Sequence, residues 1–175
     1  MRKLATEELK RVNIEEFQAN DKHPFVVVMD NVRSMNNVGS AFRTCDAFAA
    51  EKLYLTGITA TPPHREINKT AIGAQDSVAW EYAESTAGLL KDLKEKGYKI
   101  AIIEQTDQSL ELNNFEPLAN EKYAFVFGNE VFGVDEEALV LADIGLEIPQ
   151  FGTKHSLNVS VCVGVIVWDF ISKMK

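Results

Sequence analysis

The residues best placed to carry out chemistry lie near the carboxyl end of the chain, in residues 148–160. An apolar approach leads into a turn that holds Gly152, polar residues follow, and a long apolar segment begins at Leu157. At a turn from a strand into a helix, Ser156 and Asn158 would direct side-chain oxygens and free backbone N–H groups toward one point. The stretch therefore predicts a pocket wall for a polar or anionic ligand.

Composition and charge limit the classes of protein that the chain could represent. With 175 residues, 46% of them hydrophobic, it fits one domain with its own core. A net charge of −8 argues against a simple nucleic-acid binder, because neutralising phosphates requires Lys and Arg. Residues 104–143 hold ten acidic residues against one Lys, whereas residues 1–45 hold seven basic and six acidic. A basic patch outside the acidic region is still compatible with this distribution.

Three features predict the cellular setting. The first twenty residues are charged and lack the apolar segment of a signal peptide. The apolar run near the carboxyl end contains Asn158, Ser160 and Asp169 and falls short of a membrane span. Cys45 and Cys162 lie in apolar stretches without metal-ligand spacing, which predicts two buried thiols in a reducing compartment. We expect a cytoplasmic protein with no membrane segment and no metal site.

The elements that position these residues alternate between strands and helices, which predicts an α/β fold with a largely parallel sheet. Residues 24–30 form a continuous apolar run, typical of a strand that is buried on both faces. Strands are expected at residues 24–30, 52–56, 77–82, 99–104, 123–127 and 145–148. Helices are expected at residues 38–48, 66–74, 85–96 and 134–141, the third ending at Gly97 as its C-cap.

A short leader helix is expected over residues 1–20. Thr6 would cap it, and Glu7 and Glu8 would lie in its first turn. Leu9, Val12 and Phe17 would supply its apolar contacts.

Residues 157–165 carry two conflicting signals. Apolar residues alternate there at period two and Val dominates, which favours a strand. The alternation of strands and helices along the chain requires a helix after the strand at 145–148. The residues alone leave both structures open.

Three blocks of sequence together resemble a known family. They are residues 31–44 (NVRSMNNVGSAFRT), residues 127–134 (FGNEVFGV) and residues 148–161 (IPQFGTKHSLNVSV). In this order they resemble the SpoU (TrmH) branch of the SPOUT methyltransferases, which methylate ribose 2′-hydroxyls in RNA with S-adenosyl-L-methionine. The resemblance spans about residues 24–172.

The resemblance implies a particular fold. We expect a mostly parallel, Rossmann-like sheet flanked by helices, with a deep trefoil knot at the carboxyl end, a feature nearly absent from other proteins. It implies a helix over residues 157–172, a homodimer, and an active site at or near the subunit interface. The chain would divide into a leader helix, 1–23, and a SPOUT methyltransferase domain, 24–175.

The resemblance also implies catalytic roles. Arg43 matches the family's catalytic arginine; because a guanidinium stays protonated, we expect it to clamp the substrate phosphate rather than to act as a base. Asn37 would orient Arg43 or hold its loop, and Glu130 would shape the site. The alternatives are a surface arginine in a salt bridge, an Asx-turn asparagine and a solvated carboxylate.

Two further catalytic residues are implied in the third block. Ser156 and Asn158 match its polar residues at the catalytic centre, although Ser156 could instead cap the following helix. His155 departs from the family, in which a small or acidic residue often precedes the Ser. It could accept a proton or be a substituted surface position.

The binding residues implied by the resemblance form two sets. The cofactor would be held largely by backbone, with Gly128 permitting a close approach; the residues are Phe127, Gly128, Asn129, Ile148, Gln150 and Leu157. The candidates for RNA binding are Arg33, Arg65 and Lys69, and for the latter two a solvated surface charge is an equal alternative.

The expected activity is methyl transfer from S-adenosyl-L-methionine to a ribose 2′-hydroxyl in RNA, with S-adenosyl-L-homocysteine as product. Residues 61–63 and 69–74 look more like those of family members that act on a guanosine of tRNA, so tRNA is favoured over rRNA. The alternatives are an rRNA 2′-O-methyltransferase and a non-catalytic RNA-binding relative.

Overall fold

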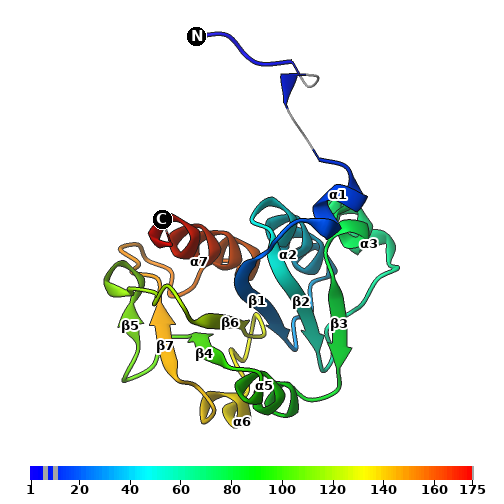
Figure 1. The fold of residues 1–175 in the computed structure, drawn as a ribbon. Helices are drawn as coiled ribbons and strands as arrows, with labels where there is room; N and C mark the ends of the chain where they lie inside the picture. Colours follow the sequence, from blue (N-terminus) through cyan, green and yellow to red (C-terminus); the bar gives the residue numbers. More distant parts are fainter. Residues whose placement is uncertain (6–7, 10–11, 175) are drawn as a thin grey trace.

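A parallel β-sheet organises the chain in the computed structural model, which describes residues 1–5, 8–9 and 12–174. The sheet has seven strands in the order β3-β2-β1-β6-β4-β7-β5, and each neighbouring pair is parallel (Figure 1). The strands are β1 (His23–Asp30), β2 (Ala50–Thr56), β3 (Trp80–Ala83), β4 (Tyr98–Ile103), β5 (Leu110–Glu111), β6 (Lys122–Phe127) and β7 (Ile144–Glu147). The predicted α/β class with a mostly parallel sheet is confirmed.

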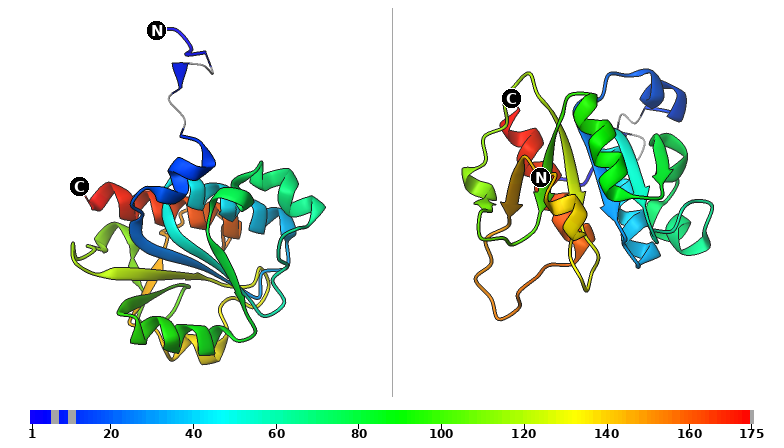
Figure 2. Two further views of the ribbon diagram at one scale, coloured as in Figure 1. Left: turned by 45° about the vertical axis from the view of Figure 1, so that its right-hand side comes forward. Right: turned by 90° about the horizontal axis from the view of Figure 1, so that it is seen from below.

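Helices cover both faces of the sheet (Figure 2). They are α1 (Ile14–Ala19), α2 (Met35–Ala47), α3 (Arg65–Ala71), α4 (Ala74–Ser77), α5 (Thr86–Glu95), α6 (Glu136–Leu139) and α7 (Val159–Lys173), with a 3-10 turn, η2 (Leu112–Asn114). The α2 and α7 helices lie on one face with α1, α3 and α4 beside them, and α5 and α6 lie on the other. This arrangement gives the sheet a hydrophobic core on each side.

The central strand β1 contributes to both cores. Phe25, Val27 and Met29 pack toward α2 and α7, whereas Val26 and Val28 pack toward α5 and α6, and none is more than 1% exposed. The apolar run therefore reflects burial on both faces, as predicted.

The carboxyl-terminal segment is a helix despite its strand-like alternation. Its buried residues recur at helical spacing: Val159, Val163, Ile166, Val167 and Phe170. The Phe170 ring lies 5.5 Å from that of Phe25 and 5.2 Å from that of Phe125, in edge-on geometry. Packing against the sheet overrides the β propensity of the valines, and the helix implied by the family resemblance is confirmed.

The single helix predicted at residues 66–74 is wrong. The chain forms α3 and α4 instead, because Ile72 (φ 52°) and Gly73 (φ 91°) are both left-handed and break the helix between them. Ser77, predicted to open the next strand, closes α4, and that strand begins at Trp80.

The leader helix is shorter than predicted. It begins after Asn13, which forms a capping box with Glu16, and it ends at Ala19. Phe17 packs against the core as predicted, but Leu9 and Val12 are 42% and 53% exposed, so the contacts predicted for them are wrong. The predicted Thr6 cap and the position of Glu7 lie outside the described residues.

Smaller differences concern short elements and one thiol. The polar stretch before β6 contains the two-residue strand β5, which pairs with β7 and is too short to leave a sequence pattern. The helix predicted at 134–141 is the shorter α6, which begins after its N-cap Asp135 and ends at Leu139. Cys45 is buried as predicted, but Cys162 is half-buried.

Two kinds of feature are absent from the described residues. No helix in that part of the chain is long and apolar enough to cross a membrane. Within the same residues, no three His, Cys, Asp or Glu side chains gather as metal ligands.

Candidate active site

A pocket of about 450 Å³ opens where β4, β6 and β7 end. Parallel strands finish at a common edge, and open α/β sheets bind ligands at such an edge. The volume lies within the roughly 300–1,000 Å³ of small-molecule sites. All six residues predicted to bind a cofactor line this pocket: Phe127, Gly128, Asn129, Ile148, Gln150 and Leu157.

The loop after β6 forms one wall of the pocket and is tightly packed. A Cβ on Gly128 would overlap the backbone of Gly133 and Val134, so only glycine permits this close approach. Asn129 and Gly133 exchange backbone hydrogen bonds of 2.9 and 3.0 Å. The Nδ2 of Asn129 also donates to the carbonyl of Asn31 across 2.7 Å, so this side chain holds the loop to the end of β1.

Glu130 ties the same loop to the loop that precedes α2. Its carboxylate accepts hydrogen bonds from the N–H groups of Arg33 (2.9 Å) and Ser34 (3.0 Å), and from Nδ2 of Asn37 (3.0 Å). Partial burial acts to raise the pKa of Glu130, but these donors favour the charged form and lower the pKa below its ordinary value. Glu130 is therefore a fixed anion and not a free surface carboxylate.

Asn37 and Asn158 extend this network across the pocket rim. Asn37 is buried on the first turn of α2, where Ser34 is the N-cap, and its Oδ1 accepts from Nδ2 of Asn158 across 3.2 Å. The Oδ1 of Asn158 in turn accepts from the N–H of Ser160 and caps α7. Three segments far apart in sequence are thus joined by Glu130, Asn37 and Asn158.

Ser156 and His155 lie at the open side of the pocket. Both line it and both are exposed. Ser156 does not cap α7, since Asn158 takes that position, so the capping alternative for Ser156 is excluded. The carbonyl of His155 accepts from Nε2 of Gln105 across 3.1 Å, which ties this segment to the end of β4.

Arg43 lies apart from the other predicted catalytic residues. It is exposed on α2, six residues beyond Asn37, and it is not among the residues that line the pocket. The structure therefore brings together Asn37, Glu130, Ser156 and Asn158, but not Arg43, within one chain.

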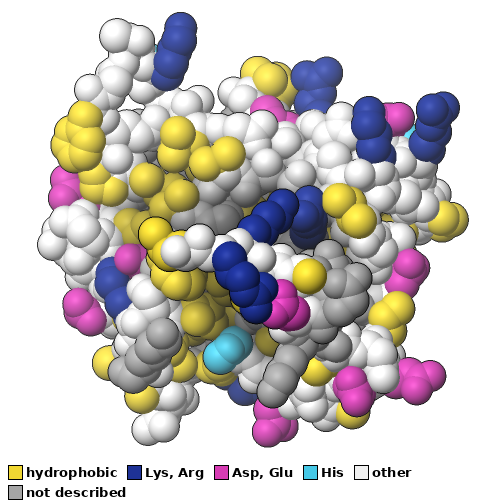
Figure 3. Space-filling view, turned by 90° about the horizontal axis from the view of Figure 1, so that it is seen from above, with side chains coloured by type: hydrophobic (Ala, Val, Ile, Leu, Met, Phe, Trp, Pro, Cys, Tyr) yellow, Lys and Arg dark blue, Asp and Glu magenta, His cyan; other side chains and the backbone are white. Residues whose placement is uncertain are grey.

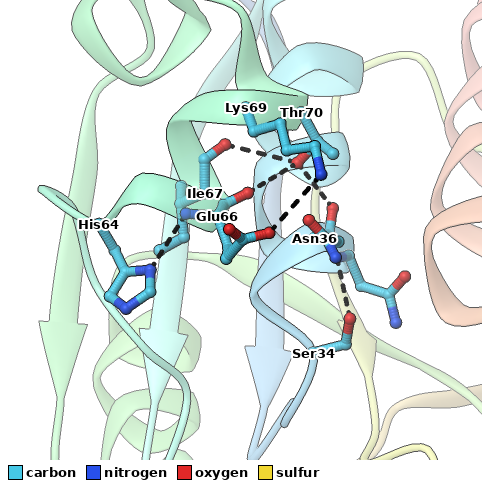
Figure 4. Close-up of polar contacts among 8 residues, drawn as sticks. Ser34, Asn36, His64, Glu66, Ile67, Lys69 and Thr70 are labelled. Atoms are coloured by element: carbon cyan, nitrogen blue, oxygen red, sulfur yellow. Dashed lines mark hydrogen bonds and ion pairs between the residues drawn. The ribbon is translucent and has the colours of Figure 1, made fainter.

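The residues predicted to bind RNA occupy two places. Arg33 is exposed beside Glu130 and lines a second, shallower hollow. Arg65 and Lys69 are exposed on α3, and Lys69 lies 3.9 Å from Glu66 in an ion pair one turn away. Hydroxyl Oγ1 of Thr70 donates to the carbonyl of Asn36 across 2.9 Å and fixes α3 against α2 (Figure 4).

The pocket also has lining residues that the sequence analysis did not identify. Glu104 and Gln105 follow directly after β4, and Cys162 faces the pocket from α7. Glu104 and Gln105 could have been predicted from the sequence, because they lie at the carboxyl end of a predicted parallel strand.

The charge of the pocket has one sign. Its lining contains the carboxylates of Glu104, Glu130 and Glu147, and no Lys or Arg among the residues that the structure describes. An acidic wall favours a cationic ligand over a phosphate.

Comparison of the coordinates with solved structures identifies the class. The chain is similar to the TrmH/SpoU tRNA modifying enzyme of A. aeolicus, with a TM-score of 0.79 and 27% identity over 91% of this chain and 79% of that chain. It shares its fold with an AdoMet-bound rRNA methyltransferase from Sinorhizobium meliloti, with a TM-score of 0.80 and 22% identity over 91% of this chain and 60% of that one. The fold is that of RNA-modifying enzymes of the TrmH/SpoU type.

The family follows from the sequence. The model of the SpoU rRNA Methylase family matches residues 24–168, and the chain belongs to this family. The tRNA (guanosine(18)-2′-O)-methyltransferase of Thermus thermophilus is 32% identical over 165 residues, which cover 93% of this chain and 81% of the relative.

Proposed function

We propose that the protein transfers a methyl group from S-adenosyl-L-methionine to a ribose 2′-hydroxyl in RNA and releases S-adenosyl-L-homocysteine and a proton. The observation that carries the proposal is the hydrogen-bonded chain of Glu130, Asn37 and Asn158, which fixes three segments around the rim of one pocket. Relatives named for 2′-O-methylation of guanosine in tRNA and in 23S rRNA support this reaction. We favour tRNA, with a guanosine as target, over rRNA.

The pocket fits the proposed cofactor. S-adenosyl-L-methionine carries a sulfonium and an ammonium, which match the acidic lining, and when bound it supplies an electrophilic methyl group. Gly128 and its neighbours Phe127 and Asn129 would wrap one side of it through their backbone. Ile148 and Gln150 would face the adenine, and Leu157 would pack against that base.

The protein residues would act mainly by positioning the acceptor. Arg43 would bind a substrate phosphate with two parallel hydrogen bonds and place the hydroxyl for in-line attack. Exposed Ser156 would contact the ribose. Asn37, Glu130 and Asn158 are already hydrogen-bonded to one another, so they would keep the rim in place without rearranging during the reaction.

We also propose that the enzyme is a homodimer. Trp168 on α7 is 58% exposed, and its ring lies 6.0 Å from that of Phe48 at the end of α2. Val161 on α7 is 49% exposed. In the view of Figure 3, hydrophobic side chains gather on the side of the molecule where α7 lies. An apolar patch of this kind favours a protein partner. Arg43 lies outside the pocket of its own chain, so the proposal places its role at an active site that the two copies share.

A carboxyl-terminal trefoil knot is part of the proposal. β7 lies beyond β4 in the sheet, yet α7 returns to pack with Phe170 against β1 and β6. The connecting segment lines the same pocket as the loop after β6. The return of α7 and the shared pocket lining support threading of the segment between β7 and α7 through the loop after β6. An experimental chain trace would test this threading.

The remaining assignments concern the ends of the chain and its surroundings. The family match begins at residue 24, which supports a leader at 1–23 and a methyltransferase domain at 24–175. The RNA phosphates would be contacted by Arg33, Arg65 and Lys69. In Figure 3, Lys and Arg side chains lie on the side of the molecule where α3 lies. We assign the enzyme to the cytoplasm.

Methyl transfer from labelled S-adenosyl-L-methionine to unmodified bulk tRNA and, separately, to rRNA tests the proposal. Label in the tRNA pool that maps to a ribose 2′-oxygen supports the favoured function, and label in rRNA alone supports the alternative substrate. RNA binding without cofactor binding or label would instead identify a non-catalytic relative.

A further inference from the structure

The carboxylate of Glu104 is held in the pocket wall by backbone groups of two segments. Glu104 directly follows β4, and its Oε1 accepts from the N–H of Gln105 across 3.1 Å. Its Oε2 accepts from the N–H of Val134 across 3.2 Å, which ties it to the segment after β6. A Cβ on Gly133 would overlap Oε2, so this glycine leaves the space that the carboxylate occupies. Glu104 is therefore fixed in place and not a mobile surface side chain.

The charge of Glu104 acts on a second residue of the pocket wall. Cys162 lines the same pocket from α7. Burial is the main cause that raises the pKa of the Cys162 thiol, and the negative charge of Glu104 raises it further. A ligand in a pocket that both residues line would lie within the field of Glu104.

The other acidic residues of the lining differ from Glu104 in their surroundings. Three donors from the loop before α2 and from the first turn of α2 bind the Glu130 carboxylate at the rim and offset part of its charge. Glu147 lies at the end of β7, the strand next to β4. Among the lining residues of the described chain there is no Lys or Arg that could neutralise Glu104. We therefore expect Glu104 to act most strongly on the charge of a ligand.

The proposed reaction changes the charge of the ligand in this pocket. The bond between sulfur and the methyl carbon breaks, and its electron pair stays on the sulfur. The methyl carbon bonds to the ribose oxygen, whose proton leaves, and the sulfonium becomes a neutral thioether. S-adenosyl-L-methionine and S-adenosyl-L-homocysteine share the adenosine, the ammonium and the carboxylate, so they differ only by one methyl group and one positive charge.

We propose that Glu104 makes the pocket selective for S-adenosyl-L-methionine over S-adenosyl-L-homocysteine, so that the attraction for the methyl donor is lost when the product forms. This inference rests on the proposed methyl transfer and names a specificity-determining residue for it. A fixed carboxylate in a pocket with walls of low dielectric constant attracts a cation more strongly than a neutral group. Release of the product would be favoured, and inhibition by the product would be weak.

Calorimetric titration tests the proposal without depending on turnover. The ligands are S-adenosyl-L-methionine, S-adenosyl-L-homocysteine and sinefungin, in which a carbon with a protonated amine replaces the methylated sulfur. Glu104→Gln removes the charge at nearly constant shape, whereas Glu104→Asp keeps the charge. Glu116→Gln removes an exposed carboxylate outside the pocket and is the matched control. The readout is the ratio of the two dissociation constants, thioether over sulfonium, because damage to the pocket wall would weaken both ligands alike.

We expect the unsubstituted protein to bind both cationic ligands about 5- to 30-fold more tightly than S-adenosyl-L-homocysteine, as for one unit charge several ångström away at a protein surface. Glu104→Gln should lower the ratio toward one, mainly by weakening S-adenosyl-L-methionine. Glu104→Asp should keep most of the ratio, and Glu116→Gln should keep all of it. The three ligands also test the charge effect in the unsubstituted protein, so the proposal is falsifiable even if Glu104→Gln does not fold.

Three results would overturn the proposal. They are binding of S-adenosyl-L-homocysteine by the unsubstituted protein at least as tight as that of both cations, an unchanged ratio in Glu104→Gln, and a ratio that changes only in Glu147→Gln. If the ratio depends on Glu104 but no methyl is transferred to tRNA or rRNA, the selectivity stands and the proposed activity falls. If methyl is transferred and the ratio is independent of Glu104, the activity stands and this inference falls. Failure to bind any of the three ligands would overturn both.

Discussion

The amide Nδ2 of Asn158 donates a hydrogen bond to Oδ1 of Asn37 across 3.2 Å, although 121 residues separate them. Asn37 lies on the first turn of α2, and Asn158 is the N-cap of α7. The bond therefore couples the starts of two helices that flank the sheet on the same face. Because Asn37 also donates to Glu130, the pocket rim behaves as one connected unit.

The Asn37–Asn158 bond predicts energetic coupling between the two residues. Asn158→Asp keeps the side-chain oxygen that caps Ser160 but removes the donor to Asn37, so it isolates this bond from the cap. In a double-mutant cycle with Asn37→Ala, we expect a coupling energy of about 0.5–3 kcal/mol in the free energy of unfolding. Urea denaturation of the four proteins measures it. Additive effects would show that the contact does not stabilise the rim.

Glu130 predicts a specific pH dependence of stability. Its pKa in the folded protein lies below the ordinary value, so its stabilisation is present above the unfolded pKa and is lost as pH falls through the folded pKa. Glu130→Gln should therefore destabilise the protein at pH 7, and this difference should shrink in acid. Urea midpoints across the acid range measure the effect. Glu116→Gln, at an exposed carboxylate, is the control and should show no such difference; a constant gap at all pH values would contradict the assigned role.

Much of the fold could be predicted from residue patterns because burial on both faces leaves continuous apolar runs, as in β1. Other features depend on contacts that no local pattern records. The valines of α7 favour a strand locally, and only packing of Phe170 against Phe25 and Phe125 makes the helix the better state. The break at Ile72 is likewise set by tertiary structure, since an isoleucine gives no sequence signal for a left-handed backbone.

The close packing around Gly128 predicts that the loop after β6 cannot accept a side chain at this position. Gly128→Ala would force its Cβ into the backbone of Gly133 and Val134 and displace the loop that forms the pocket wall. We expect a loss of about 1–3 kcal/mol in the free energy of unfolding, as for other overpacked sites, together with weakened cofactor binding. Calorimetric titration with S-adenosyl-L-methionine and thermal unfolding measure both. Gly152→Ala, where an added Cβ meets open space, should leave both unchanged.

The exposed face of α7 predicts an interface between two copies. Trp168→Glu would place a charge in the apolar patch that includes Phe48, so we expect the dimer to dissociate and methyl transfer to fall with it. Sedimentation velocity at micromolar concentration measures the oligomeric state. Leu118→Glu, at another exposed apolar residue, should leave the dimer intact. A monomeric unsubstituted protein that retains transfer would contradict the homodimer.

The candidate site shows the same division between what the sequence could and could not predict. Residues of the second and third blocks line one pocket, because the carboxyl ends of parallel strands meet at one edge, and Asn37 of the first block is hydrogen-bonded to both at its rim. Arg43 was expected at the same centre but lies outside the pocket of its own chain, because a short sequence block does not fix where a side chain lies relative to distant segments. The acidic lining from Glu104 and Glu147 was missed because two separate strand ends contribute it.

The most direct test of the account compares cofactor binding with methyl transfer in the unsubstituted protein and in Arg43→Ala. The control is Lys91→Ala, which removes an exposed charge from α5 on the other face of the sheet. We predict that Arg43→Ala binds S-adenosyl-L-methionine with unchanged affinity but transfers no label to a ribose 2′-oxygen of tRNA or rRNA, whereas Lys91→Ala transfers normally. Full transfer by Arg43→Ala, or loss of its cofactor binding, would contradict the proposed role of Arg43. Absence of transfer by the unsubstituted protein to either RNA would contradict the proposed activity itself.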